Sequence, residues 1–326
     1  MPLGHHLVYF QDQAPPADLA SDGTNPKYRP GYPFTRQLLA GGTIHSFNPI
    51  SLDGSEVQCT EEIKRVVVRG DLGKEKAIVY VERLVSSPQR SHKALSYRPA
   101  GISLLREERL LVFLRDTAEA FNKNAWEKEG NMNPHPKLHS QRPSHSGEKD
   151  EAGGILPKTY EDPDFDYSMI PTADLLLQYS FLTYNRHKIH FDRHYAQEVE
   201  GYKDLVVQGQ LSMSIMLEVL RQHLMKSGRL KVGKPFRVVY KNRALLYAGE
   251  IMRVCGRYRG HRCWEVWIRS ADGRLAVTAQ VLHYKLRENS TTGGSHLLQE
   301  DEDDTLDLTG GADQLYKSYS KKFFSR

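Results

Sequence analysis

The sequence predicts an α+β protein of two domains, in which an antiparallel sheet wraps around one buried helix. Three observations predict this architecture. The 326 residues suffice for two domains of about 100–200 residues each. A polar segment in the middle of the chain separates two blocks that carry apolar patterning. The second block contains one strongly apolar helical pattern, and four strand-like runs follow it.

The polar middle segment sets the expected domain boundaries. Residues 119–166 are rich in Pro, Ser and His and almost free of aliphatic side chains, so they cannot bury enough surface to offset chain entropy. Compact domains rarely contain so long a structureless loop. We therefore expect an N-terminal domain at 1–118, a flexible low-complexity linker at 119–166 and a C-terminal domain at 167–288. Residues 289–326 read as a disordered acidic and polar tail.

The helix of the second block is predicted at Gly209–Lys226. Met213, Met216, Leu217 and Leu220 recur at helical spacing, and neighbouring apolar residues widen this stripe until the first turns are apolar nearly all round. A helix with this distribution is buried on most faces. Gly228 can close it in the left-handed conformation.

The strands of the second block are expected at 236–241, 245–258, 262–269 and 275–286. Arg259-Gly260 and Asp272-Gly273 are typical of tight hairpin turns, so the last three runs should form an antiparallel meander.

The first block shows weaker runs of the same kind. They lie at 57–69, 77–87 and 109–115, with a turn at 70–73, and no long helix of comparable quality accompanies them. We therefore expect the first domain to be a degenerate, non-catalytic copy of the second.

Composition excludes several classes of protein. Hydrophobic residues make up 39% of the chain, and no apolar run approaches the roughly 20 residues that span a bilayer. The first residues lack a signal-peptide pattern and are too acidic for a good transit peptide. We expect an intracellular protein, cytoplasmic or mitochondrial, with no membrane partner.

Charge and cysteine content argue against a nucleic-acid partner, a disulfide framework and a zinc site. The net charge of +5 is scattered, whereas nucleic-acid surfaces concentrate basic residues on one face, so we expect no nucleic-acid partner. The three cysteines are too few and too badly spaced for a disulfide framework or a zinc site.

The densest cluster of chemically active side chains is the segment Tyr184–Tyr195, which contains His187, His190 and His194. It precedes the N-terminus of the buried helix, where free backbone N–H groups favour an anion or a polarised carbonyl. An imidazole beside such a site suits enolate chemistry, which needs a base for the α-proton and a donor for the developing charge. Solvated loop residues, or a metal site of His187, His190 and Asp192, are the competing interpretations of the cluster.

The same region carries a resemblance to a known family. Tyr179–Asp192, then Tyr195-Ala196, Glu200-Gly-Tyr202 and 205–211, closely resemble the MaoC-like hotdog enzymes. The match looks best to eukaryotic-type 3-hydroxyacyl-thioester dehydratases and mesaconyl-CoA hydratases. Stretches 2–10, 39–42 and 46–50 are similar to the first domain of that family. The resemblance covers both blocks but neither the linker nor the tail.

The resemblance implies a double hotdog, in which the second domain carries the catalytic site and the first domain completes the acyl cavity. The MaoC pattern is close to Asp-x-Asn-Pro-(Ile/Leu/Val)-His. Here His190 takes the catalytic His position, Asn185 the Asp position and His187 the Asn position. Asn185 cannot act as a carboxylate base; it can orient water. Gln208-Gly-Gln210 replaces a commoner His-Gly-Pro.

These positions define the hypothesis of mechanism. The thioester carbonyl accepts a hydrogen bond from the Gly209 N–H, His190 moves the α-proton, and Asn185 positions the water. Asp192 either orients an imidazole or caps the following turn. The expected substrate contacts are Tyr184, Arg186, Asp192, Tyr202, Gln208 and Gln210. No metal and no cofactor are expected.

The sequence thus favours a hydro-lyase that acts on a 3-hydroxyacyl or 2-enoyl thioester of coenzyme A or acyl carrier protein, as in fatty-acid metabolism. Two alternatives stay open. One is a hotdog dehydratase, isomerase or cyclase acting on a non-thioester intermediate of secondary metabolism; the other is a silent acyl-binding protein. Homodimerisation is also left open. The enzymatic interpretation requires the His190 ring to lie beside a cavity at the start of the helix that begins at Gly209.

Overall fold

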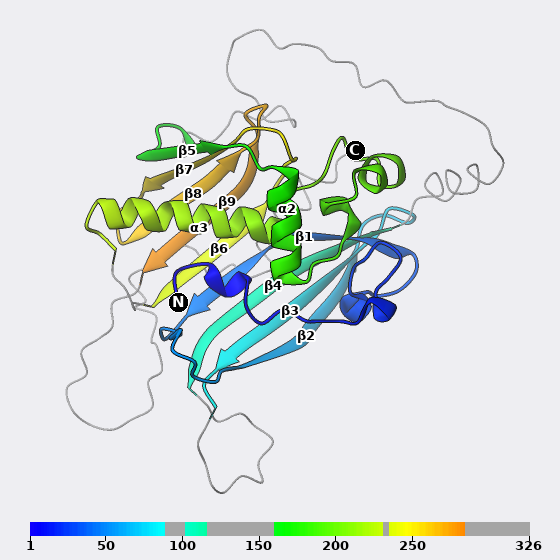
Figure 1. The fold of residues 1–326 in the computed structure, drawn as a ribbon, viewed down its shortest axis with the longest axis horizontal. Coiled ribbons are helices and arrows are strands. Elements are labelled where there is room, and N and C mark those ends of the chain that lie inside the picture. The colour runs from blue at the N-terminus through cyan, green and yellow to red at the C-terminus, as the bar shows by residue number, and fades with distance from the viewer. Residues whose placement is uncertain (89–101, 116–159, 231–234, 284–326) are drawn as a thin grey trace, which may run out of the picture.

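The computed structural model describes residues 1–88, 102–115, 160–230 and 235–283. Within these ranges the strands form one nine-stranded sheet in the order β2-β3-β4-β1-β6-β9-β8-β7-β5. Every neighbouring pair is antiparallel. The first four strands come from the N-terminal half of the chain and the other five from the C-terminal half (Figure 1).

The N-terminal half contributes four long strands. They are β1 (Phe34–Ser46), β2 (Gln58–Arg69), β3 (Lys76–Ser86) and β4 (Ser103–Arg115). The predicted runs at 57–69 and 77–87 correspond to β2 and β3, and the run at 109–115 is the second part of β4. The sequence did not indicate β1, which contains two consecutive glycines, Gly41 and Gly42.

The C-terminal half contains two α-helices and five strands. They are β5 (Phe165–Met169), α2 (Ala173–Thr183), α3 (Gly209–Lys226), β6 (Phe236–Asn242), β7 (Met252–Tyr258), β8 (Cys263–Arg269) and β9 (Leu275–His283). The predicted meander is confirmed, since β8 pairs with both β7 and β9. The Gly260 and Gly273 turns have the positive φ angles of 84° and 83° that this hairpin chemistry requires.

Helix α3 occupies the centre of the C-terminal half, as predicted, and its bounds match the expected 209–226. Met213 is 1% exposed, and Met216, Leu217 and Leu220 are fully buried in the main core cluster. The strands β5 to β9 curve around this helix, and α2 lies across the molecule near its start (Figure 1). Gly228 ends it with a φ of +66°. This arrangement is a hotdog.

The two halves join through the pairing of β1 with β6, in which Gly41 lies opposite Lys241 and Gly42 opposite Tyr240. Strand β1 lies close to both of its neighbours, to β6 at Gly41 and to β4 at Gly42, because both positions lack a Cβ. A Cβ on Gly42 would come within 2.1 Å of the Glu108 carbonyl oxygen, and one on Gly41 within 2.5 Å of the Tyr240 carbonyl oxygen. The chain is therefore a double hotdog with one continuous sheet, and pairing of two chains stays a prediction.

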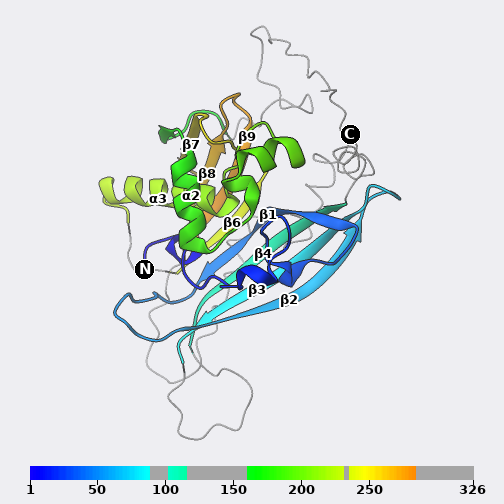
Figure 2. The ribbon, with the colours of Figure 1, turned by 45° about the vertical axis from the view of Figure 1, so that its right-hand side comes forward.

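The N-terminal sheet curves in the same way but differs in what fills it. Among its described residues no α-helix lies on the concave face. The first 33 residues cover it instead, with short 3-10 turns at His5–Leu7, Pro16–Asp18 and Pro26–Tyr28 (Figure 2). Because a thin segment replaces a whole helix, the N-terminal half leaves room for a cavity between the halves.

Two expectations differ from the structure in detail, and one helix was not expected. The expected boundary between linker and C-terminal domain, at 166/167, falls inside β5, where Phe165 and Asp166 already pair with Gly256 and Cys255. The long run predicted at 245–258 is a strand only from Met252 onward. The sequence also did not indicate α2. Residues 119–159 of the expected linker and the whole of the expected tail, 289–326, lie outside the described residues.

Candidate active site

The cluster of histidines lies on a loop between α2 and α3. Helix α2 ends at Thr183, its C-cap residue Tyr184 is left-handed at a φ of 51°, and the Asn185 amide donates back to the Ser180 carbonyl at 3.0 Å. A short 3-10 turn, Lys188–His190, then directs the chain inward. His187 and His190 are buried as a result, whereas His194 stays exposed.

The ring of His190 is held in one orientation and one tautomer. Its Nδ1 lies 2.7 Å from the carbonyl oxygen of Val206, which can only accept, so Nδ1 carries the proton. The neutral ring then has its lone pair on Nε2, for which the structure gives no hydrogen-bond partner among the described residues. Burial, reinforced by the nearby His187, lowers the pKa of His190 to about 3. The ring is therefore a neutral imidazole that can accept a proton through Nε2.

The segment that carries Val206 leads directly into α3. It is fixed on both sides, because the Val206 amide donates to Ile189 at 2.9 Å and the Val207 amide donates to Leu246 at 2.8 Å. Gln208 occupies the N-cap position without a capping side-chain hydrogen bond, and Gly209 is the first residue of the helix. The first amides of a helix have no intrahelical acceptor, and the structure gives the Gly209 amide no other acceptor among the described residues. The ring of His190 thus lies beside the start of the buried helix.

A cavity of about 260 Å³ lies at this point and reaches into the N-terminal half. His190 and Gly209 both line it, as do five more of the residues that the sequence indicated: Tyr184, Asn185, Arg186, Gln208 and Gln210. Strands β1, β3 and β4 supply its far wall, through residues such as Leu39, Val81 and Leu111. Both halves of the chain therefore enclose the cavity.

Asn185 and Gln208 are fixed by local contacts. The Asn185 side-chain oxygen accepts from the His187 amide at 3.2 Å. The Gln208 side-chain nitrogen donates to the Leu176 carbonyl at 2.8 Å and contacts the Ser180 hydroxyl at 2.9 Å. Because Leu176 can only accept there, this fixes the amide orientation and leaves Gln208 Oε1, which is buried, without a partner in the described structure.

Two of the expected substrate contacts lie elsewhere. Asp192 does not line the cavity; its Oδ1 accepts from the Tyr195 amide at 2.9 Å, so it caps the following turn and orients no imidazole. Tyr202 is also outside the cavity, and its ring stacks under the Arg36 guanidinium at 5.6 Å. The structure gives neither residue access to a ligand in this cavity.

The structure brings two groups to the site that the sequence did not indicate: Asp22, which lies behind the His187 ring of the histidine cluster, and an ionic network of the N-terminal sheet. His187 lines the cavity and its ring meets that of His190 edge-on, with 5.5 Å between centroids. Asp22, from the N-terminal half, lies behind it, with its Oδ2 at 3.9 Å from His187 Nε2. The spacing of the histidines was visible in the sequence, but nothing local links Asp22 to them.

The second missed group is a buried ionic network on the concave face of the N-terminal sheet. Register places Glu61, Arg83 and Glu107 side by side on β2, β3 and β4. Arg83 bonds to Glu61 at 2.6 Å and to Glu107 at 3.0 Å, and Arg109 binds both Glu107 oxygens, at 2.8 and 3.0 Å.

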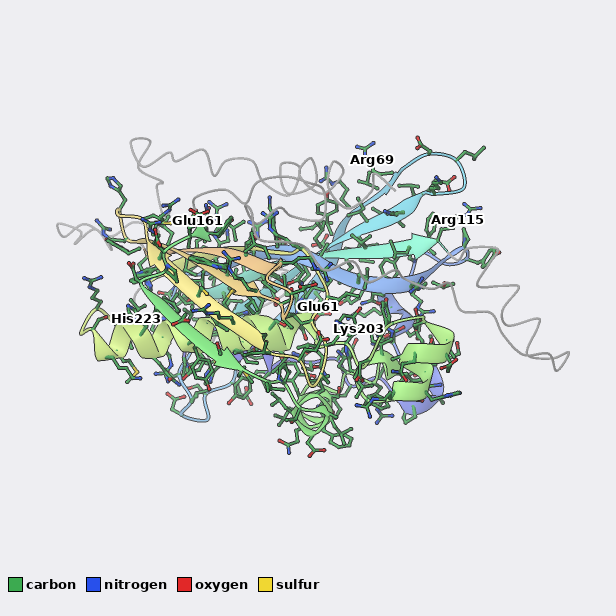
Figure 3. The ribbon with its side chains drawn as sticks, turned by 90° about the horizontal axis from the view of Figure 1, so that it is seen from above. Glu61, Arg69, Arg115, Glu161, Lys203 and His223 are labelled. Atoms are coloured by element: carbon green, nitrogen blue, oxygen red, sulfur yellow. The ribbon has the colours of Figure 1, made fainter. Side chains whose placement is uncertain are left out.

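Two members of this network, Glu61 and Arg109, line the cavity, and Arg109 connects it to α3. The guanidinium of Arg109 lies 3.1 Å from the side-chain oxygen of Gln210 in the amide orientation that satisfies both groups. Glu61 lies near the middle of the molecule, while Arg115 and His223 mark its opposite ends (Figure 3). Because Glu61 and Arg109 line it, this part of the cavity is polar.

Removing Glu107 should strongly destabilise the protein. Burial alone would raise the pKa of this carboxyl, but the Arg109 and Arg83 guanidiniums outweigh burial and lower it to about 2. Glu107→Ala would leave both arginines without their shared carboxylate, at a cost of about 3–5 kcal/mol in the free energy of unfolding. Urea denaturation measures this loss. Glu108→Ala, on the neighbouring, more exposed residue, is the matched control, and a loss equal to that control would contradict the account.

Stability should also fall in mild acid. Burial lowers the pKa of His6 to about 4, of His45 to about 4 and of His190 to about 3. The unfolded chain protonates these rings near pH 6.5, so below that pH it binds more protons than the folded chain. The free energy of unfolding should therefore fall steeply from about pH 6.5 toward pH 4. Urea midpoints between pH 8 and 5 test this, and a flat profile would contradict it.

The metal interpretation finds no support in the described part of the chain. No group of three or more His, Cys, Asp or Glu side chains there is arranged to hold a metal ion. Of the three residues considered, Asp192 faces its own turn.

No helix among the described residues combines the length and apolarity that crossing a membrane requires.

Comparison with known proteins matches this chain to a protein family. The family model described as hydroxyacyl-thioester dehydratase type 2 matches residues 4–146 and 139–248, which is more than half of the chain. The mesaconyl-C(4)-CoA hydratase of Chloroflexus aurantiacus is 25% identical over 278 residues, which cover 85% of this chain and 81% of that protein. The mitochondrial hydroxyacyl-thioester dehydratase type 2 of Saccharomyces cerevisiae is 26% identical over 270 residues, 78% of this chain and 79% of the relative.

A solved structure supports the fold. The peroxisomal multifunctional enzyme type 2 of Drosophila melanogaster superposes with a TM-score of 0.50 at 12% identity, and the match covers 76% of this chain and 37% of that one.

Proposed function

Because the chain belongs to the hydroxyacyl-thioester dehydratase type 2 family and is a hydro-lyase, we propose that it interconverts a 3-hydroxyacyl thioester and a 2-enoyl thioester. One observation carries this proposal: the neutral His190 ring and the amide of Gly209 line the same cavity. Together they offer a base for an α-proton and a donor for the charge that its removal creates.

The base is Nε2 of His190. In the dehydration direction it accepts the α-proton of the 3-hydroxyacyl thioester. The hydrogen bond from Nδ1 to the Val206 carbonyl holds the ring in place and stabilises the imidazolium that forms. The low pKa of His190 keeps the ring unprotonated and ready in the free enzyme at neutral pH.

The donor is the Gly209 N–H at the start of α3. The thioester oxygen gains negative charge as the α-proton leaves, and an unpaired amide at a helix N-terminus stabilises that charge through both its hydrogen bond and the helix dipole. Glycine also suits the packing here, since a Cβ on residue 209 would lie 2.9 Å from the Asn242 side-chain nitrogen.

Asn185 and Gln208 are the proposed contacts of the hydroxyl group or the water. Asn185 presents its side-chain amide at the cavity wall, and the partnerless oxygen of Gln208 can accept a hydrogen bond from a hydroxyl. Tyr184 and Arg186, both exposed at the cavity rim, are the proposed contacts for the carrier end of the thioester. Either coenzyme A or acyl carrier protein is compatible with these contacts.

The size of the cavity favours a short acyl group. About 260 Å³ is slightly below the range of roughly 300–1,000 Å³ that is typical of sites for drug-sized ligands. In the N-terminal half its lining includes Glu61 and Arg109, whose charged groups a long alkyl chain would cut off from water. We therefore expect four-carbon acyl groups to be better substrates than ten-carbon ones.

Incubation with crotonyl-CoA and with trans-2-decenoyl-CoA, followed by the absorbance of the enoyl thioester, tests the proposal. We expect crotonyl-CoA to be hydrated with the higher kcat/KM. A faster reaction of the ten-carbon substrate would overturn the size argument. No reaction with either, together with binding of a small non-thioester ligand in the cavity, would favour the secondary-metabolite alternative.

We place the activity inside the cell and, of the two expected compartments, in mitochondria. The basis is the yeast relative, whose name gives that location. Fractionation of the source cells with detection by antibody tests this, and recovery of the protein in the cytosol alone would contradict it.

A further inference from the structure

A loop of the N-terminal half docks directly on the histidine loop of the C-terminal half. The Lys188 amide donates to the Asp22 carbonyl at 2.9 Å. Gly23 packs so closely that a Cβ there would lie 1.9 Å from the Arg186 carbonyl oxygen, and its φ of +85° also requires glycine. These backbone contacts fix the position of Asp22 relative to His187.

The carboxylate of Asp22 is buried and held from several sides. Its Oδ1 accepts from the Thr24 amide at 2.9 Å and from the Thr24 hydroxyl at 2.8 Å. Its Oδ2 pairs with Arg29 and also lies 3.9 Å from Nε2 of His187, which is a Coulombic contact and too long for a hydrogen bond. Asp22 is therefore a fixed negative charge directly behind the His187 ring.

His187 lies between this charge and the cavity. Burial lowers its pKa, Asp22 and Glu200 oppose that shift, and Arg29 and Arg36 add to it. The charged and titratable groups that act on the ring are thus Asp22, Arg29, Arg36, Glu200 and His190. Among the acidic groups Asp22 has the largest effect, so it is the group that most favours the protonated ring.

We propose that His187 is a second catalytic imidazole, the acid that protonates the departing hydroxyl group, and that Asp22 is its positioning residue. This inference rests on the proposed function. It assigns the acid that Asn185 cannot be, since an amide does not ionise. The carboxylate beside His187 comes from the other half of the chain, because Asp192 on the site's own loop faces its own turn.

In the dehydration step one ring takes up a proton and the other ring releases one. His190 Nε2 takes the α-proton, and the C–H electron pair becomes the new C=C bond. The C–O bond breaks, its electron pair leaves with oxygen, and protonated His187 donates the proton that makes the leaving group water. Hydration is the reverse: neutral His187 takes a proton from water as the oxygen attacks, and protonated His190 returns one to the α-carbon. The two rings together carry one positive charge before and after the step.

A change of leaving group tests the acid role. His187→Gln should lower kcat for dehydration of 3-hydroxybutyryl-CoA by about 10²–10⁴, the range for loss of a general acid, with a smaller change in KM. The same variant should eliminate chloride from 3-chlorobutyryl-CoA at close to the wild-type rate, because chloride leaves without a proton. His190→Gln should fail with both substrates. His194→Gln, on an exposed histidine of the same segment, is the matched control.

The pH profile tests the role of Asp22. A protonated acid predicts that wild-type kcat/KM for dehydration rises as pH falls from 9 toward neutral. Asp22→Asn should shift this rise to lower pH, because each unit by which the pKa of His187 falls lowers its protonated fraction about tenfold. Asp22→Glu should restore part of the loss, and Asp18→Asn, at an exposed aspartate of the same segment, should change nothing.

Each outcome has a distinct meaning. If wild-type protein dehydrates the hydroxy substrate but His187→Gln does so within about threefold of wild type, the inference fails while the proposed function stands. If His187→Gln slows both substrates equally, its role is structural and the inference fails. If wild-type protein reacts with neither thioester, the proposed function itself fails. Circular dichroism and melting temperature confirm that each variant is folded.

Discussion

Replacing His190 by alanine should lower kcat for an enoyl or 3-hydroxyacyl thioester by about 10²–10⁴, the range for loss of a general acid or base. The reason is geometric. The ring is held by a 2.7 Å bond to the Val206 carbonyl and lines the cavity together with Gly209, so its Nε2 is the nitrogen available to an α-proton. Steady-state kinetics on crotonyl-CoA and 3-hydroxybutyryl-CoA measure the effect.

Two further variants separate chemistry from folding. His190→Gln keeps a donor for the Val206 carbonyl but has no nitrogen of suitable basicity, so it should be as inactive as His190→Ala. His194→Ala removes an exposed imidazole four residues along the chain and should retain wild-type kcat. Near-wild-type turnover by the folded His190→Gln variant would show that His190 is not the base.

Replacing Gly209 by proline should lower kcat by about 10²–10³, the cost of losing one donor to a developing oxyanion. Gly209 is the first residue of α3, the position where proline fits a helix well, and Gln208 before it has the extended conformation (φ −60°, ψ 133°) that a following proline favours. The substitution therefore removes the N–H while the helix remains.

Gly209→Ala is the matched control, because it adds a Cβ at the same place but keeps the N–H. That Cβ would lie 2.9 Å from the Asn242 side-chain nitrogen and 3.3 Å from a methyl of Leu39, so some loss of activity through crowding is expected in both variants. The donor's contribution is the difference between them. Equal kcat values for the proline and alanine variants would show that this amide plays no part.

The parts of the fold that could be predicted are those encoded locally. Helix α3 repeats its apolar pattern over 18 residues, and both turns of the meander carry glycine where the backbone needs it, so both were found. Helix α2 was missed because its apolar side chains do not mark a buried face: Phe181 is 71% and Leu182 61% exposed, whereas Ser180 and Thr183 are buried.

The same distinction holds for the site. His190, Gly209 and the loop between them are close in sequence, and most of the residues expected around them line one cavity. The ionic network was not indicated, because the pairing of Glu107 with Arg83 is set by strand register. Asp22 meets His187 only through the docking of the two halves. Such contacts between distant segments have no local sequence signal.

The roles of His190 and Gly209 can be tested by a crystal structure of the His190→Gln variant with bound 3-hydroxybutyryl-CoA. We expect the thioester oxygen to lie within hydrogen-bond distance of the Gly209 nitrogen, with the α-carbon facing residue 190 and the acyl end directed toward Arg109. A thioester bound outside this cavity, or bound in it with the α-carbon turned away from residue 190, would show that these two residues do not form the active site.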